Sequence, residues 1–143
     1  MMQGEYVIVM RHDHPMARGR LTTKKYVSAE HVLVARMGTQ GRSVVDDLLA
    51  EQGFERRVAR KTSSFWSALV LVSRSDYAAT LPAAAVNAMS TFLDLKVKNA
   101  PFPLGGFNYD LVWHKRAEED PAQRWFRELV LECAKRVTAS GLS

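Results

Sequence analysis

The sequence lacks the features that indicate a disulfide, a membrane span or an export signal. Its 143 residues include one cysteine, Cys133, which excludes an internal disulfide and suits a reducing, cytoplasmic setting. No apolar run approaches the roughly 20 residues that a membrane-spanning helix needs. The N-terminus, Met-Met-Gln-Gly-Glu, has no basic segment that leads into an apolar core, so we expect no signal peptide.

Charge of one sign is not concentrated along the chain. The formal net charge of +5 and the pI of about 9.6 are compatible with nucleic acid or an anionic ligand as a partner. The basic residues are scattered in pairs, such as Arg56/Arg57 and Lys115/Arg116, and no predicted helix carries a basic stripe. The sequence also has no RNP, zinc-finger or KH motif. A mildly basic, solvated surface accounts for the charge, and we expect no direct nucleic-acid binding by this chain.

What the sequence does contain is an alternation of strand-like and helix-like segments. Apolar, β-branched or alternating runs predict strands at 6–10, 31–35, 57–61, 76–81, 95–98 and 107–114. Capping residues and apolar periodicity predict helices at 21–27, 43–52, 65–72, 83–89 and, after Pro121 at its first position, 122–137. This order predicts an α/β fold with a largely parallel, covered sheet. The first strand has no element ahead of it to pair with, so the chain begins as if in mid-fold.

Nothing in the sequence predicts a catalytic residue. No serine lies in a Gly-x-Ser-x-Gly elbow, and neither a P-loop nor a Gly-x-Gly-x-x-Gly motif is present. Ser43 and Asp46 resemble a capping box, and Ser63 and Ser64 stand where another helix begins, so capping is their default role. Cys133 lies at helical spacing among apolar residues, which predicts a small packed residue and not a nucleophile.

The His12-Asp13-His14 sequence raises the question of a metal site. Residues i and i+2 of a strand point to the same face, so the two histidines could act together. A zinc site needs three or four ligands, however, and the other histidines, His31 and His114, are isolated in the sequence. We therefore expect solvent-exposed polar residues at the end of a strand, and neither a metal nor a cofactor.

Two predicted loops end at helix starts, where backbone N–H groups favour anions. In a parallel sheet both loops, 38–43 and 62–65, would lie at the carboxyl ends of strands, where open α/β sheets bind ligands. A small carboxylate could accept hydrogen bonds there, with an aromatic ring over its apolar part. Plain helix caps and a packed aromatic explain the same pattern. The helix 65–72 is apolar on most sides, which predicts either burial or a dimer contact. The hydrogen bonds to the carboxylate would come from Thr39, Ser63 and Ser64 or their backbone amides, and the aromatic ring would be that of Phe65 or Trp66.

Five segments together resemble a known family. They are VIVMRHDHP (7–15), HVLVARMG (31–38), SVVDDLLAEQGFERRVA (43–59), TSSFWSALVLVSRSDYAATLP (62–82) and LVWHKRAEEDPAQRWFRELV (111–130). In order and spacing they resemble the effector-binding domain of LysR-type transcriptional regulators. The segments RxDHP, SDYAATLP and WHKR…DPAQRWFREL are especially similar to the subgroup that includes nodulation and aromatic-degradation regulators. The resemblance covers nearly the whole chain.

The resemblance implies a type 2 periplasmic-binding-protein-like α/β fold with two lobes. Strands 6–10 and 76–81 would cross between the lobes. The second lobe would be complete, at about 17–75, and the first lobe only partly present, in 1–16 and 76–143. A full regulator of this family also carries an N-terminal winged helix-turn-helix, a linker helix and the first half of lobe one, which this sequence lacks. DNA contact is therefore expected only through an N-terminal domain of the parent protein.

The resemblance also implies a function and a site. A small effector, carboxylic or aromatic, would bind in the cleft between the lobes of a non-enzymatic, cytoplasmic, ligand-sensing domain that forms a homodimer or higher oligomer, with no membrane partner. A solute-binding protein of the same architecture, or a small metal-dependent hydrolase, is the alternative. The residues that match the family's effector contacts are Gly38, Thr39, Ser63, Ser64, Phe65 and Thr80.

Overall fold

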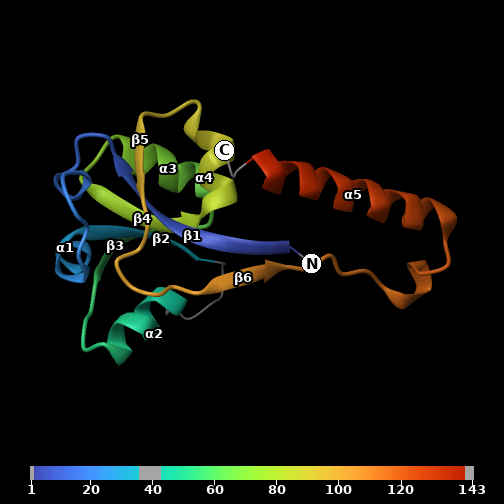
Figure 1. Ribbon diagram of the computed structural model, residues 1–143, viewed down its shortest axis with the longest axis horizontal. Helices are drawn as coiled ribbons and strands as arrows, with labels where there is room; N and C mark the ends of the chain where they lie inside the picture. The colour runs from blue at the N-terminus through green and yellow to red at the C-terminus, as the bar shows by residue number, and fades with distance from the viewer. Residues whose placement is uncertain (1, 36–42, 141–143) are drawn as a thin grey trace.

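A long first strand, β1 (Met2–Arg11), organises the fold of the computed structural model, which describes residues 2–35 and 43–140 (Figure 1). It pairs antiparallel with β4 (Tyr77–Pro82), β5 (Leu95–Lys98) and β6 (Gly106–Tyr109). Strand β2 (Glu30–Val34) instead runs parallel to β3 (Arg57–Thr62) and to β4.

The sheet is therefore mixed, in the order β3-β2-β4-β1-β5 with β6 on the other part of β1, and the prediction of a largely parallel sheet was wrong. The two central strands run in opposite directions because the chain enters the sheet along β1 and returns along β4. The α/β class itself, a sheet covered by helices, is confirmed.

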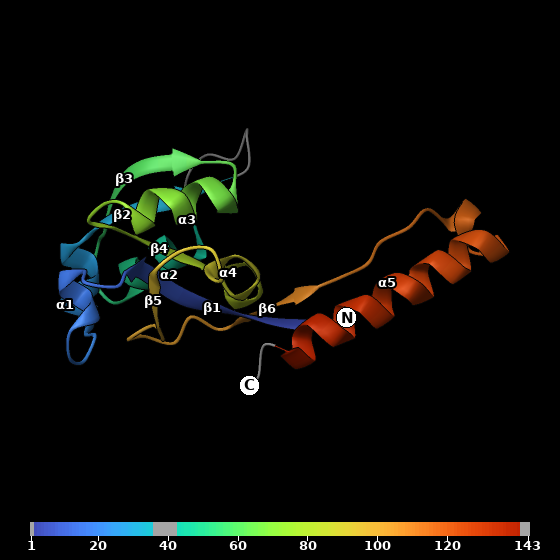
Figure 2. The same cartoon turned by 90° about the horizontal axis from the view of Figure 1, so that it is seen from above.

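The two halves of β1 belong to different parts of the molecule. Its first residues pair with β6, with Gln3 opposite Asn108, whereas its second half pairs with β4 and β5, with Val9 opposite Ala79 and Val97. Figures 1 and 2 show the result, a body that holds β2–β5 and an arm that holds β6 and α5 (Pro121–Ser140). Strand β5 and helix α4 (Ala83–Ser90) lie in the body with β2 and β3. The division of the chain into lobes at 17 and 75 stays a prediction.

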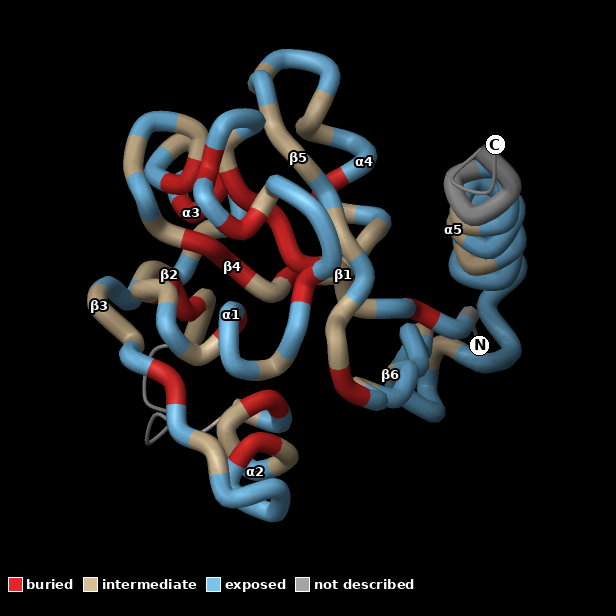
Figure 3. The backbone as a smooth tube through the Cα atoms, turned by 60° about the vertical axis from the view of Figure 1, so that its left-hand side comes forward, coloured by how far each residue is buried: buried red, intermediate tan, exposed pale blue. Residues whose placement is uncertain are grey.

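Alternating side chains of the sheet, together with side chains of the segments that cover it, form two cores. On one face, under α1 (Thr23–Ser28) and α2 (Val44–Glu51), lie Ile8, Met10, Tyr26, Leu49, Ala78 and Phe102. On the other face, under α3 (Phe65–Ser73) and α4, lie Val9, Val32, Leu69, Val72, Ala79, Leu81 and Val86. The buried residues, red in Figure 3, follow β1, β2, β4 and the inner sides of these helices. Both faces of the sheet are thus covered, as the apolar runs predict.

The helix boundaries follow the capping residues in the sequence. Thr22 caps α1 by accepting a hydrogen bond from the amide of Lys25, at 3.3 Å. The predicted capping box of α2 is confirmed, because Ser43 accepts from the Asp46 amide while the Asp46 carboxylate accepts from the Ser43 amide. After α2 the chain turns at Gly53, whose φ of 75° favours glycine.

The C-terminal arm differs from its prediction. Strand β6 covers only Gly106–Tyr109 because β1 offers it four partners, so the predicted strand over 107–114 is too long. A short 3-10 helix, Lys115–Ala117, then leads to α5, which begins at Pro121 as predicted. Figures 1 and 2 show α5 standing apart from the body. Cys133 is consequently exposed, and its prediction as a packed residue was wrong.

Among residues 2–35 and 43–140, no helix combines the length and the apolar character that crossing a membrane requires.

Candidate functional site

One edge of the sheet gathers the ends of three parallel strands. Strands β2, β3 and β4 run in the same direction, and the amide of Ala35, just beyond β2, donates to the carbonyl of Thr62 at the end of β3, at 2.9 Å. The antiparallel β1 adds Tyr6 opposite Pro82 at this edge. Carboxyl ends of parallel strands are where open α/β sheets bind ligands. This carboxyl edge is therefore the candidate site.

Helix α3 begins at the carboxyl edge, directly after β3. The hydroxyl of Ser64 accepts a hydrogen bond from the amide of Ser67 at 3.3 Å, so Ser64 is a helix cap. The neighbouring Ser63 is exposed, and its hydroxyl has no hydrogen-bond partner among the described residues. Phe65 is 39% exposed beside it. Capping thus accounts for Ser64, whereas Ser63, Phe65 and the first-turn amides can face a ligand.

Thr80, on β4, lies towards the same edge but on the other face of the sheet from α3. It follows the alternation of Ala78, which points into the core under α1 and α2. Its hydroxyl is 2.7 Å from the hydroxyl of Tyr26, and its side chain is only half-buried. The structure therefore brings Thr80 and the Ser63–Phe65 segment to one edge of the sheet, on opposite faces. Gly38 and Thr39, the other predicted contacts, lie outside the described residues.

A buried arginine, Arg56, forms hydrogen bonds with the residues that lie behind Thr80. The side chain of Arg56, just before β3, is 2% exposed and donates to Asp46 Oδ1 at 2.7 Å, to the Tyr26 hydroxyl at 2.9 Å and to Ser43 Oγ at 2.9 Å. Burial alone would raise the pKa of Asp46, but the hydrogen bonds from Arg56 and Ser43 outweigh it and hold that pKa below its ordinary value. Arg56 thus links the start of α2, through Asp46, to α1, through Tyr26.

Sequence reasoning missed both Arg56 and Tyr26 as parts of this region. Arg56 was grouped with the scattered surface basic residues, because the sequence alone cannot distinguish a buried arginine from an exposed one. Its neighbour Arg57 has the same local pattern but forms a surface ion pair with Glu30 at 3.1 Å. Only the packing of α1 and α2 on the sheet separates the two arginines.

His31 is buried against Tyr26, with ring centroids 4.4 Å apart. Its Nε2 donates to the main-chain carbonyl of Tyr26 at 2.7 Å, whereas its Nδ1 has no partner in the described part of the chain. Burial lowers the pKa of His31 to about 4, so the ring is neutral at pH 7. This buried, half-satisfied imidazole makes the core beneath Thr80 sensitive to acid.

The two histidines at the end of β1, His12 and His14, differ in burial. His14 is buried, with Nε2 bonded to the carbonyl of Asp76 at 2.8 Å and Nδ1 accepting from the Met16 amide at 3.0 Å. The side chain of His12 is 66% exposed. The prediction of a solvent-exposed pair thus holds for His12 and was wrong for His14, which caps the 3-10 helix Pro15–Ala17. In the ranges 2–35 and 43–140 no three metal-binding side chains come together.

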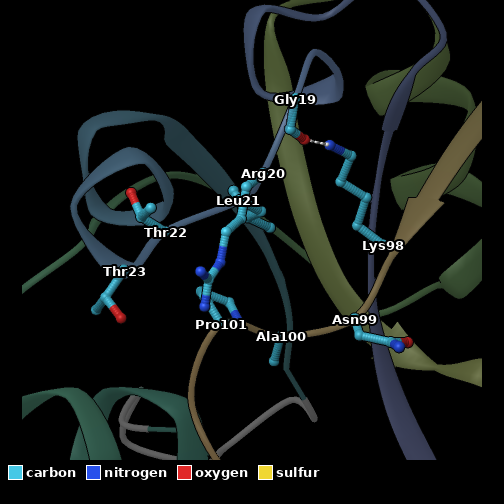
Figure 4. Close-up of a pocket in the computed structure, with 9 residues that line it drawn as sticks. All are labelled: Gly19, Arg20, Leu21, Thr22, Thr23, Lys98, Asn99, Ala100 and Pro101. Carbon is cyan, nitrogen blue, oxygen red and sulfur yellow. Dashed lines mark hydrogen bonds between the residues drawn. The ribbon is translucent and has the colours of Figure 1, made fainter.

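A separate open hollow of about 600 Å³ lies between the 19–23 turn and the 98–101 segment (Figure 4). Its cations are Arg20 and Lys98, and the Lys98 amino group already donates to the carbonyl of Gly19 at 2.5 Å. None of the predicted effector contacts that the structure describes, Ser63, Ser64, Phe65 and Thr80, lines this hollow. Sequence reasoning did not single out these residues, because the hollow forms between segments far apart in the chain.

Comparison with known proteins places this architecture in a family. The family model for the LysR substrate binding domain matches residues 1–135. Nodulation protein D of Rhizobium leguminosarum bv. trifolii is 32% identical over 123 residues, which are 86% of this chain and 39% of that protein. The chain spans about two fifths of the length of the curated relatives that it matches.

Solved structures agree with the sequence comparison. A putative transcriptional regulator from Vibrio parahaemolyticus has a TM-score of 0.83 and 25% identity over 99% of this chain and 65% of its own. The effector-binding domain of QuiR, in complex with shikimate, has the same fold, with a TM-score of 0.64 and 17% identity over 94% of this chain and 63% of its own. The predicted type 2 periplasmic-binding-protein-like fold is thereby confirmed. Because the family model matches nearly the whole chain, this protein belongs to the family of LysR substrate-binding domains.

Proposed function

We propose that this chain is the effector-sensing part of a cytoplasmic, non-enzymatic LysR-type transcriptional regulator. Its effector is a small carboxylic or aromatic compound, and DNA is contacted by an N-terminal part of the longer parent. The family match and the relatives, which are transcriptional regulators, support this function over a solute-binding protein or a hydrolase. QuiR, which has the same fold, binds shikimate in its effector-binding domain.

The start of α3 at the carboxyl edge is the observation that carries the proposal. The Ser63 hydroxyl and the first-turn amides of α3 can donate to a carboxylate, while the exposed ring of Phe65 covers an apolar part of the effector. The hydroxyl of Thr80 adds a polar contact from β4. Gly38 and Thr39 complete the proposed set. An effector held by two segments of the sheet edge can favour one arrangement of the lobes over another.

Ligand titration tests the proposal. Benzoate, shikimate and succinate are added to the chain, and to the full polypeptide that its gene encodes, while thermal unfolding and binding heat are followed. A ligand at 100 times its Kd stabilises the folded state by about 2.7 kcal/mol. We expect Ser63→Ala and Phe65→Ala to weaken that effect, whereas the exposed controls Ser67→Ala and Phe92→Ala leave it unchanged. If none of the three probes stabilises the full polypeptide, or if all four variants respond alike, the proposal is wrong.

We further propose that the protein self-associates, with a second copy covering the apolar side of α5. Trp125 is 64% exposed, and Phe126 and Leu129 are exposed on the same helix. Contiguous apolar surface of this kind marks an interaction site in soluble proteins. Light scattering over a range of concentrations should give a mass above 16.1 kDa, which Trp125→Glu lowers and the control Gln123→Glu does not. A monomer at every concentration would contradict the proposal.

A further inference from the structure

A buried chain of hydrogen bonds ends at the Thr80 hydroxyl. The Arg56 Nη1 group donates to the Tyr26 hydroxyl at 2.9 Å, and the Tyr26 hydroxyl lies 2.7 Å from Thr80 Oγ1. Tyr26 is fully buried, Arg56 is nearly so, and Thr80 is only half-buried. The chain therefore runs from a cation in the interior to a hydroxyl near the carboxyl edge.

The direction of the second bond follows from the first. A guanidinium has only donors, so the oxygen of Tyr26 must accept from Arg56. Among the described residues, Thr80 is the only acceptor within reach of the Tyr26 hydroxyl hydrogen. If Thr80 donated to Tyr26 instead, that hydrogen would be buried without a partner, which is costly. Tyr26 thus donates to Thr80, and the hydrogen of the Thr80 hydroxyl remains available.

The guanidinium of Arg56, at the start of this hydrogen-bond chain, is held in its orientation by further hydrogen bonds. Two further donors of Arg56 are held by Asp46 at 2.7 Å and by Ser43 at 2.9 Å, and the Ser43 hydroxyl donates in turn to Asp46 at 2.9 Å. Hydrogen-bond chains in a low-dielectric interior polarise one another. The guanidinium therefore strengthens the donation from Tyr26 and fixes its direction.

We propose that Arg56 and Tyr26 are positioning residues that present the Thr80 hydroxyl to the effector as a hydrogen-bond donor. Thr80 then selects an oxygen acceptor, such as a carboxylate, and discriminates against an ammonium group at the same place. This inference rests on the proposed effector-sensing function and adds to it the polarity of one contact.

Paired probes and hydroxyl deletions test the inference. The affinity of the full polypeptide for benzoate is compared with its affinity for benzylamine, which has a similar shape and a cationic head. Tyr26→Phe and Thr80→Val should each weaken benzoate binding about tenfold, the loss of one hydrogen bond to a charged group. Benzylamine binding should not weaken. Thr80→Ser should keep the wild-type preference, and so should the control Tyr77→Phe, which removes a hydroxyl from the same strand.

A double variant separates positioning from simple loss of structure. If Tyr26 acts through Thr80, Tyr26→Phe combined with Thr80→Val weakens benzoate binding no more than Thr80→Val alone. A Tyr26→Phe protein that loses benzoate and benzylamine equally, or that binds benzoate as the wild type does, overturns the inference.

The remaining outcomes keep this inference distinct from the proposed function. If Thr80→Val weakens benzoate binding and Tyr26→Phe does not, the positioning chain is refuted and effector sensing stands. If Tyr26→Phe fails to fold, the ratio of benzoate to benzylamine affinity in Thr80→Val decides, and an unchanged ratio overturns the inference. If the wild type binds none of benzoate, shikimate and succinate, effector sensing and the inference fail together.

Discussion

Mild acid should destabilise this protein through the buried His31. The imidazole is fully buried, its Nε2 donates to the carbonyl of Tyr26, and its Nδ1 has no acceptor among the described residues. A second proton would therefore place an unpaired N–H and a charge in the core. The nearby Arg56 and His14 oppose that charge, whereas the hydrogen bond to the Tyr26 carbonyl and the Asp46 carboxylate favour it. Burial is the main reason that the pKa falls from 6.5 to about 4.

The sign and size of the effect follow from proton linkage. Because the folded-state pKa of His31 lies below its unfolded value, the unfolded chain binds a proton that the folded chain does not. The stability due to the neutral ring is complete above pH 6.5 and is lost as the pH falls towards 4. With these two pKa values, about 2 kcal/mol is lost between pH 7.5 and pH 5, and about 3 kcal/mol below pH 4. The lowered pKa of Asp46 adds acid sensitivity only near and below its ordinary value of 3.8.

Urea unfolding at pH 7.5 and pH 5 measures this loss. The wild type should lose about 2 kcal/mol of unfolding free energy more than His31→Gln, which keeps a donor for the Tyr26 carbonyl but does not titrate. His12→Gln removes an exposed histidine and should keep the wild-type dependence on pH. If His31→Gln and the wild type lose the same free energy, the neutral buried imidazole is not the cause and the reasoning is refuted.

Three further substitutions test how the body is held together. Arg56→Met leaves the partly buried Asp46 carboxylate without its cation and should cost about 3 kcal/mol of unfolding free energy. The control Arg57→Met removes an exposed ion pair and should cost under about 1 kcal/mol. Equal losses of the two variants in urea unfolding would contradict a buried pair. Leu49→Ala empties a fully buried position under the sheet and should cost about 3 kcal/mol by the same assay, and a loss within error of zero would place α2 off the core. Gly53→Ala should cost about 1 kcal/mol of unfolding free energy, because the φ of 75° is unfavourable for alanine. A Cβ at this position meets no atom within 4 Å, so the cost comes from the backbone conformation alone. An unchanged unfolding free energy would argue against this turn.

The local structure of this protein was largely predictable from its sequence. The capping box at Ser43 and Asp46, the start of α3 after Ser64 and the start of α5 at Pro121 all depend on contacts within a few residues. The family resemblance was also readable from ordered segments of the chain. Strand direction was not, because the pairing of β1 with β4 joins residues that are 70 or more positions apart in the sequence.

In the candidate site, too, some residues could be predicted from local sequence and others could not. Ser63, Ser64 and Phe65 could be proposed from a helix start, since the amides of a first turn need no distant partner to favour an anion. Thr80 was proposed only from the resemblance, and the structure adds what lies behind it, a tyrosine and an arginine from two other elements.

The sequence alone determined the α/β class, the helix starts and the family, because each depends on periodicity, caps or ordered motifs that are local in the chain. Tertiary structure alone decided that Arg56 is buried while Arg57 is exposed, that His14 and His31 lie inside while His12 does not, and that the sheet is mixed. Burial and hydrogen-bond partners arise from segments that meet only in the folded chain, and these set the pKa of His31 and the direction of the bond to Thr80.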